Sequence, residues 1–122
     1  MTKKLSSLAL ARAAGRLALE KKAFDVRILK LKDLTSVCDY YVIASGDADV
    51  QVKAITRDVH DGLAKLGYKP VGREGVREGN WVLLDYIDVV VHVFYEPTRR
   101  FYALEKLWDV RARPAEQPAA NV

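Results

Sequence analysis

The densest apolar run of the sequence lies between Asn80 and Tyr95, and it divides into two stretches of strand length. The second stretch, residues 89–94, is apolar at odd and even positions alike. A strand with one face in water would alternate between apolar and polar residues, so this pattern predicts a strand covered on both faces. The sheet of the protein is therefore predicted to be built around this run.

Helical periodicity appears in three other segments, where apolar residues recur at three- and four-residue spacing. Ser6 or Ser7 is the expected N-cap of the first helix. Asp47 is the expected N-cap of the second helix, and Gly67 is its expected stop. The predicted helices span about residues 7–22, 48–66 and 98–110.

Two further strands precede the central run. Residues 23–31 alternate between apolar and polar side chains, which predicts a strand with one face in water. Residues 39–46 are rich in strand formers and end at Gly46. A short edge strand is predicted at residues 68–71, followed by a charged, glycine-punctuated loop at residues 73–78.

The element order predicts a small single α/β domain, in which a mixed β-sheet is packed with helices. The strand at 39–46, the second helix and a following strand could form a right-handed crossover. The predicted domain covers residues 1–110. Residues 111–122 carry Pro114 and Pro118 among Ala, Glu and Gln, and they are predicted to be a disordered C-terminal tail.

Composition narrows the class of protein. The 122 residues suffice for one domain with its own core, and a net charge of +4 is only mildly basic. The single cysteine, Cys38, excludes an intramolecular disulfide and fits a reducing cytosol. No apolar run is long enough to span a membrane. We therefore expect a cytoplasmic protein with no membrane partner.

Catalytic and metal-binding patterns are sparse. Cys38 with His60 or His92 lacks an activating motif, and a lone cysteine beside a strand is more often a small buried residue. The only cluster of potential metal ligands is Asp85, Asp88 and His92, but aspartates at a strand connection usually bond their own backbone. The sequence therefore predicts no catalytic residue, metal or cofactor, and no small-molecule substrate.

Aromatic and arginine side chains near the central run favour a binding function. Trp81 opens the first stretch, Asp88 sits by its turn, and Arg99, Arg100 and Tyr102 follow the second. Such residues commonly anchor protein interfaces. The alternative, that Trp81 and Tyr102 merely cover the edge of the core, is equally compatible with the sequence.

Four segments in fixed order, residues 39–46, 51–55, 81–94 and 100–108, resemble the ribosomal silencing factor family (RsfS, also called Iojap). The resemblance covers about residues 5–108. It implies a fold similar to nucleotidyltransferases, without their catalytic residues, and a non-enzymatic regulator of translation. Members of this family bind the large ribosomal subunit through its protein number fourteen and block joining of the small subunit when nutrients are short. They can also form homodimers off the ribosome.

Residue by residue, the resemblance carries the family's motif onto Glu74, Gly75, Trp81, Asp85, Asp88, His92, Arg100, Tyr102 and Glu105. It implies that six of these line or support the ribosome-facing surface: Trp81, Asp85, Asp88, His92, Arg100 and Tyr102. The chain departs from the family at Ile87, where the family usually has Gly. If the backbone there has a positive φ, the β-branched side chain costs at least ~1 kcal/mol of strain.

Two alternative functions stay open at this point. The first is a metal-dependent nucleotidyltransferase-like enzyme that uses Asp85 and Asp88, which requires metal-dependent nucleotide binding. The second is an RNA-binding module, whose mark is a steep salt dependence. The modest net charge of +4 argues against the second.

Overall fold

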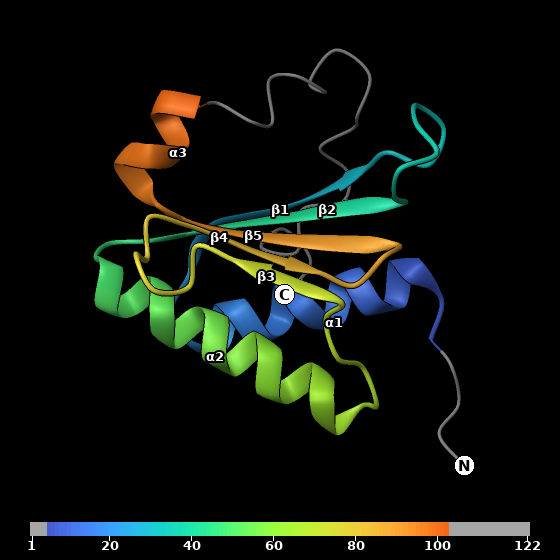
Figure 1. The fold of residues 1–122 in the computed structure, drawn as a ribbon, viewed down its shortest axis with the longest axis horizontal. Coiled ribbons are helices and arrows are strands. Elements are labelled where there is room, and N and C mark those ends of the chain that lie inside the picture. Colours follow the sequence, from blue (N-terminus) through green and yellow to red (C-terminus); the bar gives the residue numbers. More distant parts are fainter. Residues whose placement is uncertain (1–4, 103–122) are drawn as a thin grey trace.

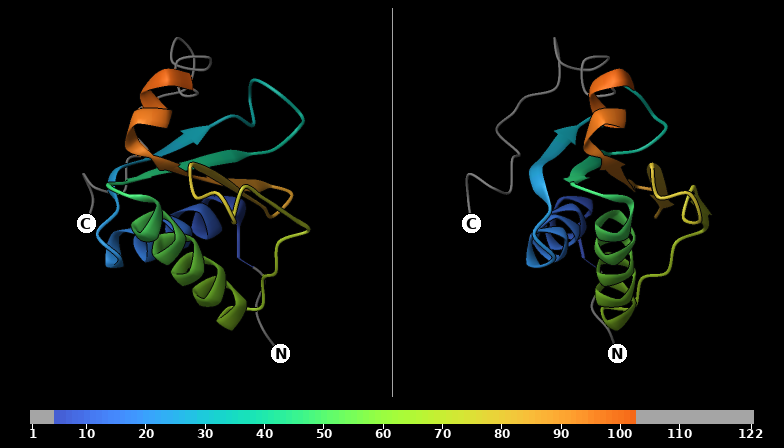
Figure 2. Two further views of the ribbon diagram at one scale, coloured as in Figure 1. Left: turned by 60° about the vertical axis from the view of Figure 1, so that its left-hand side comes forward. Right: turned by 90° about the vertical axis from the view of Figure 1, so that its left-hand side faces the viewer.

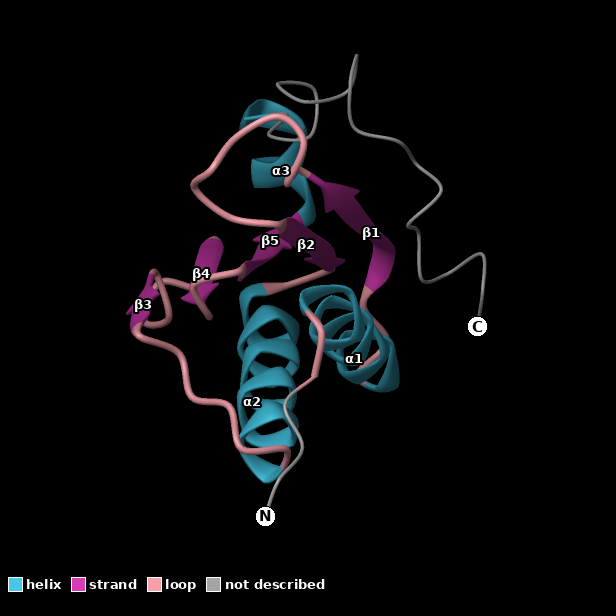
Figure 3. Cartoon of the chain, turned by 90° about the vertical axis from the view of Figure 1, so that its right-hand side faces the viewer, coloured by secondary structure: helices cyan, strands magenta, loops and turns pink. Residues whose placement is uncertain are grey.

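The computed structural model describes residues 5–102, which form one five-stranded sheet between two layers of helix (Figure 1). Its strand order is β1-β2-β5-β4-β3, where the strands are β1 (Phe24–Lys30), β2 (Tyr40–Gly46), β3 (Gly72–Glu74), β4 (Trp81–Asp85) and β5 (Val89–Tyr95). The helices α1 (Ser7–Glu20) and α2 (Asp49–Lys65) cover one face of the sheet. The helix α3 (Glu96–Tyr102) lies on the other face, as the side views in Figures 2 and 3 show.

The predicted α/β class with a mixed sheet is confirmed. β2 and β5 pair in parallel through a connection that includes α2, whereas the other three neighbouring pairs are antiparallel. The end of the predicted third helix and the predicted tail lie outside the described residues. None of the helices within residues 5–102 is long and apolar enough to cross a membrane.

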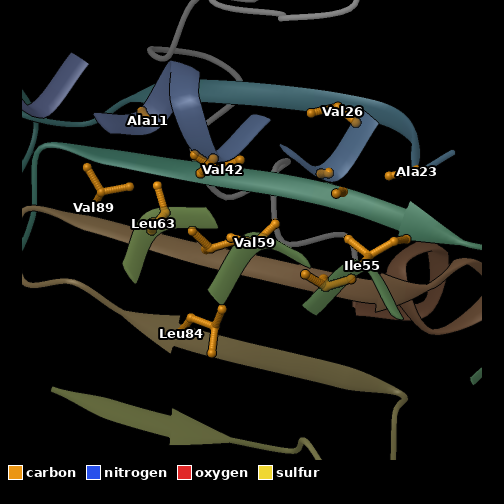
Figure 4. Packing of buried hydrophobic residues seen from close by; sticks show 14 of the residues in the cluster. Ala11, Ala23, Val26, Val42, Ile55, Val59, Leu63, Leu84 and Val89 are labelled. Carbon is orange, nitrogen blue, oxygen red and sulfur yellow. The ribbon is translucent and has the colours of Figure 1, made fainter. Parts of the chain in front are cut away.

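β5 occupies the centre of the sheet, between β2 and β4, as its continuous apolar pattern predicts. Every residue from Val89 to Phe94 is buried. Alternate residues serve two cores, because successive side chains of a strand point to opposite faces. The core beneath the sheet packs on α1 and α2 and includes Val89, which is labelled in Figure 4, with Val91 and Val93. The smaller core on the α3 side includes Val90 and Phe94.

The two long helices follow their apolar stripes. Ser6 caps α1 as predicted, because its hydroxyl accepts a hydrogen bond from the Ala9 N–H at 3.1 Å. The predicted cap of α2 is wrong: Ala48 occupies the N-cap position and makes no side-chain bond. The Asp47 N–H instead donates to the side-chain oxygen of Gln51, so the turn is held from within the helix.

The predicted edge strand at residues 68–71 is also wrong, because β3 pairs with β4 through Gly72–Glu74. Pro70 has no N–H to donate, and the first bond to β4 comes from the Val71 N–H to the Asp85 carbonyl at 2.8 Å. The charged segment predicted as a loop therefore supplies the edge strand. Charged side chains suit an exposed edge, since they discourage pairing with other chains.

The third helix starts two residues earlier than predicted, at Glu96 instead of Thr98. Pro97 lies in the first turn, where its missing N–H leaves no helical hydrogen bond unmade. The chain therefore passes from β5 directly into α3 and crosses to the face opposite α1 and α2 (Figure 3).

Candidate protein-binding face

Partly exposed side chains gather on the side of the sheet that carries α3. We call this surface the α3 face and define it by Tyr41 of β2 and by Trp81, Leu83 and Asp85 of β4, around the buried His92 of β5. The three β4 residues share this face because they alternate with the buried Val82 and Leu84, which point to the helices beneath.

Trp81 and His92 are joined across the two strands. The indole Nε1–H of Trp81 donates a hydrogen bond to Nδ1 of His92 at 3.0 Å. An indole nitrogen can only donate, so Nδ1 of His92 must accept, and the ring proton lies on Nε2. In residues 5–102 this Nε2 is buried and has no hydrogen-bond partner.

Burial determines the charge of His92. Its side chain is only 3% exposed, and burial lowers its pKa to about 4. The ring is therefore neutral at physiological pH, which agrees with its acceptor role toward Trp81. The resemblance implies that His92 lines or supports a binding surface, and the structure places it beneath the α3 face, where it supports Trp81 and is itself buried.

Four aromatic rings form a connected cluster in the α3 face. Trp81 stacks on Phe94 with ring centroids 4.9 Å apart, and Tyr41 meets His92 edge-on at 4.5 Å. Both arrangements are favourable geometries for aromatic pairs. The cluster fixes the orientation of Trp81 while leaving part of its surface exposed. Trp81 therefore both covers the smaller core and faces outward.

Carboxylates converge at the end of the α3 face where β4 turns into β5. Burial and, to a lesser extent, the negative charges of Asp39, Asp85 and Asp88 together raise the pKa of Cys38 to about 11. All three carboxylates therefore lie close enough to act on one thiol. Cys38 itself is 4% exposed, as predicted for a small buried residue, and its thiol stays protonated and unreactive.

The turn between β4 and β5 depends on the Asp85 carboxylate. Its Oδ1 accepts a hydrogen bond from the Ile87 N–H at 2.8 Å, so the expectation of an aspartate that bonds its own backbone is confirmed. Ile87 has a φ of 74° and is 61% exposed. The backbone at Ile87 therefore has the positive φ that glycine usually provides at this position of the family. Here a β-branched residue occupies that conformation.

Two neighbouring arginines of α3, Arg99 and Arg100, lie in different environments. Arg100 is exposed and pairs with Glu96 within α3, at 2.8 Å between Nε and Oε2. Arg99 is 4% exposed, and its guanidinium donates to the Ser45 hydroxyl at 2.8 Å and to the Asp25 carbonyl. Arg99 therefore fastens α3 to β1 and β2, a role that the sequence did not reveal. Tyr102 ends α3, and its side chain lies outside the described atoms.

The sequence also missed Tyr41 and Leu83 as members of the α3 face. Leu83 alternates with buried residues in β4, which is the signal that could have found it, whereas β2 is buried at every position except Tyr41 and carries no such pattern. Among residues 5–102 no group of three or more His, Cys, Asp or Glu side chains is arranged to hold a metal ion.

The fold and this face define a small α/β domain with one mixed sheet and an aromatic, acid-ended surface beside α3. A sequence model of the family described as "Ribosomal silencing factor during starvation" matches residues 4–121. The chain belongs to this ribosomal silencing factor family, RsfS.

Individual relatives agree with the family. The chain is 43% identical to the ribosomal silencing factor RsfS of Bacillus subtilis over 89 residues, covering 73% of this chain and 75% of that protein. It is 36% identical to the chloroplastic protein Iojap of Arabidopsis thaliana, covering 84% of this chain and 42% of that protein. A crystal structure of a Chromobacterium violaceum protein superimposes with a TM-score of 0.84 at 35% identity, covering 86% and 88% of the two chains.

Proposed function

We propose that this chain binds the large ribosomal subunit, through its protein number fourteen, and sterically blocks joining of the small subunit. Translation is thereby repressed when nutrients are limited. Membership of the ribosomal silencing factor family supports the class of function. The α3 face is the surface that we assign to the contact.

The observation that carries this assignment is the bonded pair of Trp81 and His92 within the aromatic cluster. Trp81 is partly exposed, yet its orientation is fixed by a hydrogen bond and by stacking on Phe94. A side chain that is already ordered loses little conformational entropy when a partner covers it. Large, rigid aromatic residues of this kind dominate the binding energy of many interfaces.

The acidic end of the α3 face determines how the domain is oriented on its partner. Asp88 is exposed and Asp85 is partly exposed at the β4–β5 turn. Carboxylates at the rim of an interface attract basic groups of the partner, raise the association rate and fix the register. We therefore expect a basic surface on the large subunit to lie against this turn.

The proposed mechanism is occlusion, in which the bound domain occupies space that the small subunit needs. It requires no bond-making step, no cofactor and no small-molecule substrate, and it takes place in the cytoplasm. No observation favours the alternative of a metal-dependent nucleotidyltransferase-like enzyme. Asp85, which that enzyme would use, already accepts the Ile87 N–H through Oδ1.

Affinity for isolated large subunits tests the assignment of the face. We expect Trp81→Ala to weaken binding by about 2 kcal/mol, or roughly thirtyfold, if the indole is an anchor. Because Trp81 also covers the smaller core, Asp88→Lys provides a second variant at an exposed position of the same face. We expect it to slow association.

Leu66→Ala provides the matched control. Leu66 is an exposed apolar residue, 40% accessible, at the end of α2 on the helix side of the sheet. Its removal is expected to leave the affinity for large subunits unchanged. Folded Trp81→Ala and Asp88→Lys proteins that bind as tightly as the Leu66→Ala protein would contradict the assignment of the α3 face.

A homodimer off the ribosome is a further part of the proposal, supported by the resemblance to the family. Sedimentation velocity of the free protein across a range of concentrations tests it. A species of twice the chain mass that grows with concentration is expected. A single monomeric species at the highest concentration would contradict the dimer and leave the ribosome contact standing.

A further inference from the structure

A concave site lies on the opposite side of the sheet from the α3 face. It is a cleft of about 360 Å³ between α2 and the strands β3 and β4, which lie to one side of that helix in Figure 3. Its volume falls within the usual range for sites that bind small molecules or parts of larger ones. The ribosome contact proposed above does not use it.

Three cationic side chains line this cleft from two elements. Lys53 and Arg57 lie one turn apart on α2, so they project from the same side of the helix, and Arg73 lies across from them on β3. Within residues 5–102, none of the three has a carboxylate oxygen within 4.0 Å. Their charges are therefore available to a ligand.

Only one carboxylate shares the lining with them. Asp61 belongs to the next turn of α2, and its Oδ1 lies 3.1 Å from Nδ1 of the neighbouring His60. The cleft thus has an excess of positive charge. Concave surfaces lined by charges of one sign concentrate counter-ions, because their low-dielectric walls focus the electrostatic potential.

The walls of the cleft are fixed by the fold. Arg73 pairs with Leu84 in the β3–β4 ladder, so both side chains point to the helix side, and Leu84 reaches toward α2 (Figure 4). The loop that carries Val76 is closed by a bond from the Gly79 N–H to the Gly75 carbonyl at 3.0 Å. A Cβ at Gly79 would lie 3.1 Å from Cε of Lys53, so the bare glycine allows the loop to pack on that side chain.

We propose that this cleft binds a phosphate group, carried either by an RNA backbone or by a free nucleotide. Guanidinium groups donate paired hydrogen bonds to phosphate oxygens, and Lys53 adds a compact charge beside them. Val76, which is 37% exposed, gives the same cleft an apolar wall, which suits the ribose or base attached to a phosphate. An inorganic anion would make no contact that requires an apolar wall.

Binding to purified probes tests the proposal on the full chain, without any ribosome. The two probes are a short fluorescein-labelled single-stranded RNA and ADP, each titrated at low salt with a chelator present. The test variant combines Lys53→Gln, Arg57→Gln and Arg73→Gln. The control combines Arg16→Gln, Lys21→Gln and Lys69→Gln, exposed cations outside the cleft whose loss changes the net charge by the same amount.

We expect the cleft variant to lose at least ~10-fold in affinity for a probe that the wild type binds, and the control to lose less than about threefold. For RNA, the slope of log affinity against log salt should decrease by about two, because each contacted phosphate of a single strand contributes about 0.7. Loss of RNA binding identifies a backbone phosphate, whereas loss of ADP binding identifies a free nucleotide.

Equal losses in the two triple variants would overturn the proposal, as would a wild-type protein that binds neither probe. Arg57→Gln alone guards against a folding defect, because Arg57 is exposed at the rim of the cleft. It is expected to weaken the same probe by at least about threefold. Since no ribosome is present, failure here leaves the proposed occlusion of subunit joining untouched.

Discussion

Trp81 and His92 face each other across β4 and β5, with the indole N–H bonded to Nδ1 of the imidazole at 3.0 Å. This bond requires a neutral histidine, because a protonated ring would present a second N–H to the indole donor. The partly exposed indole of the aromatic cluster is therefore held in place by a buried group that can titrate. The stability of the domain and the order of its binding face are linked through His92.

His92 should make the domain sensitive to acid. Burial lowers its pKa to about 4, so between pH 6.5 and 4 the unfolded chain binds a proton that the folded chain does not. The free energy of unfolding therefore falls as the pH drops through this window, by about 3 kcal/mol in total. Urea unfolding at a series of pH values measures this loss.

His92→Gln is the matched variant for that experiment, since its side-chain oxygen can accept the Trp81 N–H but does not titrate in this range. The pH profile of the variant should be flatter than that of the wild type by this amount. His60 is present in both proteins, so its contribution cancels. Parallel profiles between pH 7 and 4 would show that His92 is not the sensitive group.

The backbone at Ile87 should be strained, and a substitution by glycine should relieve that strain. Its φ of 74° disfavours any residue with a Cβ, so Ile87→Gly is expected to raise the free energy of unfolding by about 0.5–1 kcal/mol, after the added flexibility of glycine is subtracted. Ile87→Ala keeps the Cβ and removes the same exposed methyl groups, and no gain is expected from it. Thermal unfolding of the three proteins decides the matter. A glycine variant no more stable than the alanine variant would rule out strain at this turn.

Arg99 and Arg100 are adjacent but should behave differently. Arg99→Ala removes buried hydrogen bonds to Ser45 and Asp25, so we expect a loss of about 2–3 kcal/mol in unfolding free energy. Arg100→Ala removes an exposed pair with Glu96, which contributes about 0.5 kcal/mol or less. Chemical unfolding of both variants measures the difference. Equal effects would mean that Arg99 does not fasten α3 to the sheet.

Gly75 and Gly72 provide a comparable contrast near Trp81. A Cβ at Gly75 would lie 2.0 Å from the Trp81 carbonyl oxygen, and the residue has a φ of 74°. Gly75→Ala is therefore expected to destabilise the domain by more than ~2 kcal/mol and to displace the start of β4. Gly72→Ala meets no atom within 4 Å, so its effect should be within ~0.5 kcal/mol. Similar melting temperatures for the two variants would contradict this account.

The sequence predicted the elements whose burial is periodic or continuous. β5 and α2 follow directly from their apolar patterns, because burial on two faces or on one stripe leaves a local signature. The short edge strand did not, since its position depends on where Pro70 allows pairing with a strand that comes later in the chain. The local sequence pattern cannot show which residues of a distant strand will pair with this one.

The candidate site, like the fold, was predictable only where local sequence pattern reports on burial. Trp81 and Asp85 were predicted to be binding residues from their place beside the central run, and the structure places both in the α3 face. Alternation along β4 could have added Leu83, but β2 has no alternation that would have indicated Tyr41. The bond from Arg99 to the Asp25 carbonyl joins residues 74 positions apart, so no local pattern distinguishes Arg99 from Arg100. Long-range contacts of this kind exist only once the sheet has formed.

The central claim is that the protein occludes the small subunit, and a subunit-joining assay tests it most directly. Purified small and large subunits are mixed with increasing amounts of the protein, and joined ribosomes are quantified by gradient sedimentation. The account predicts that the joined fraction falls as the protein saturates the large subunits, and that Trp81→Ala requires roughly thirtyfold more protein. An unchanged joined fraction while the large subunits are saturated would contradict it.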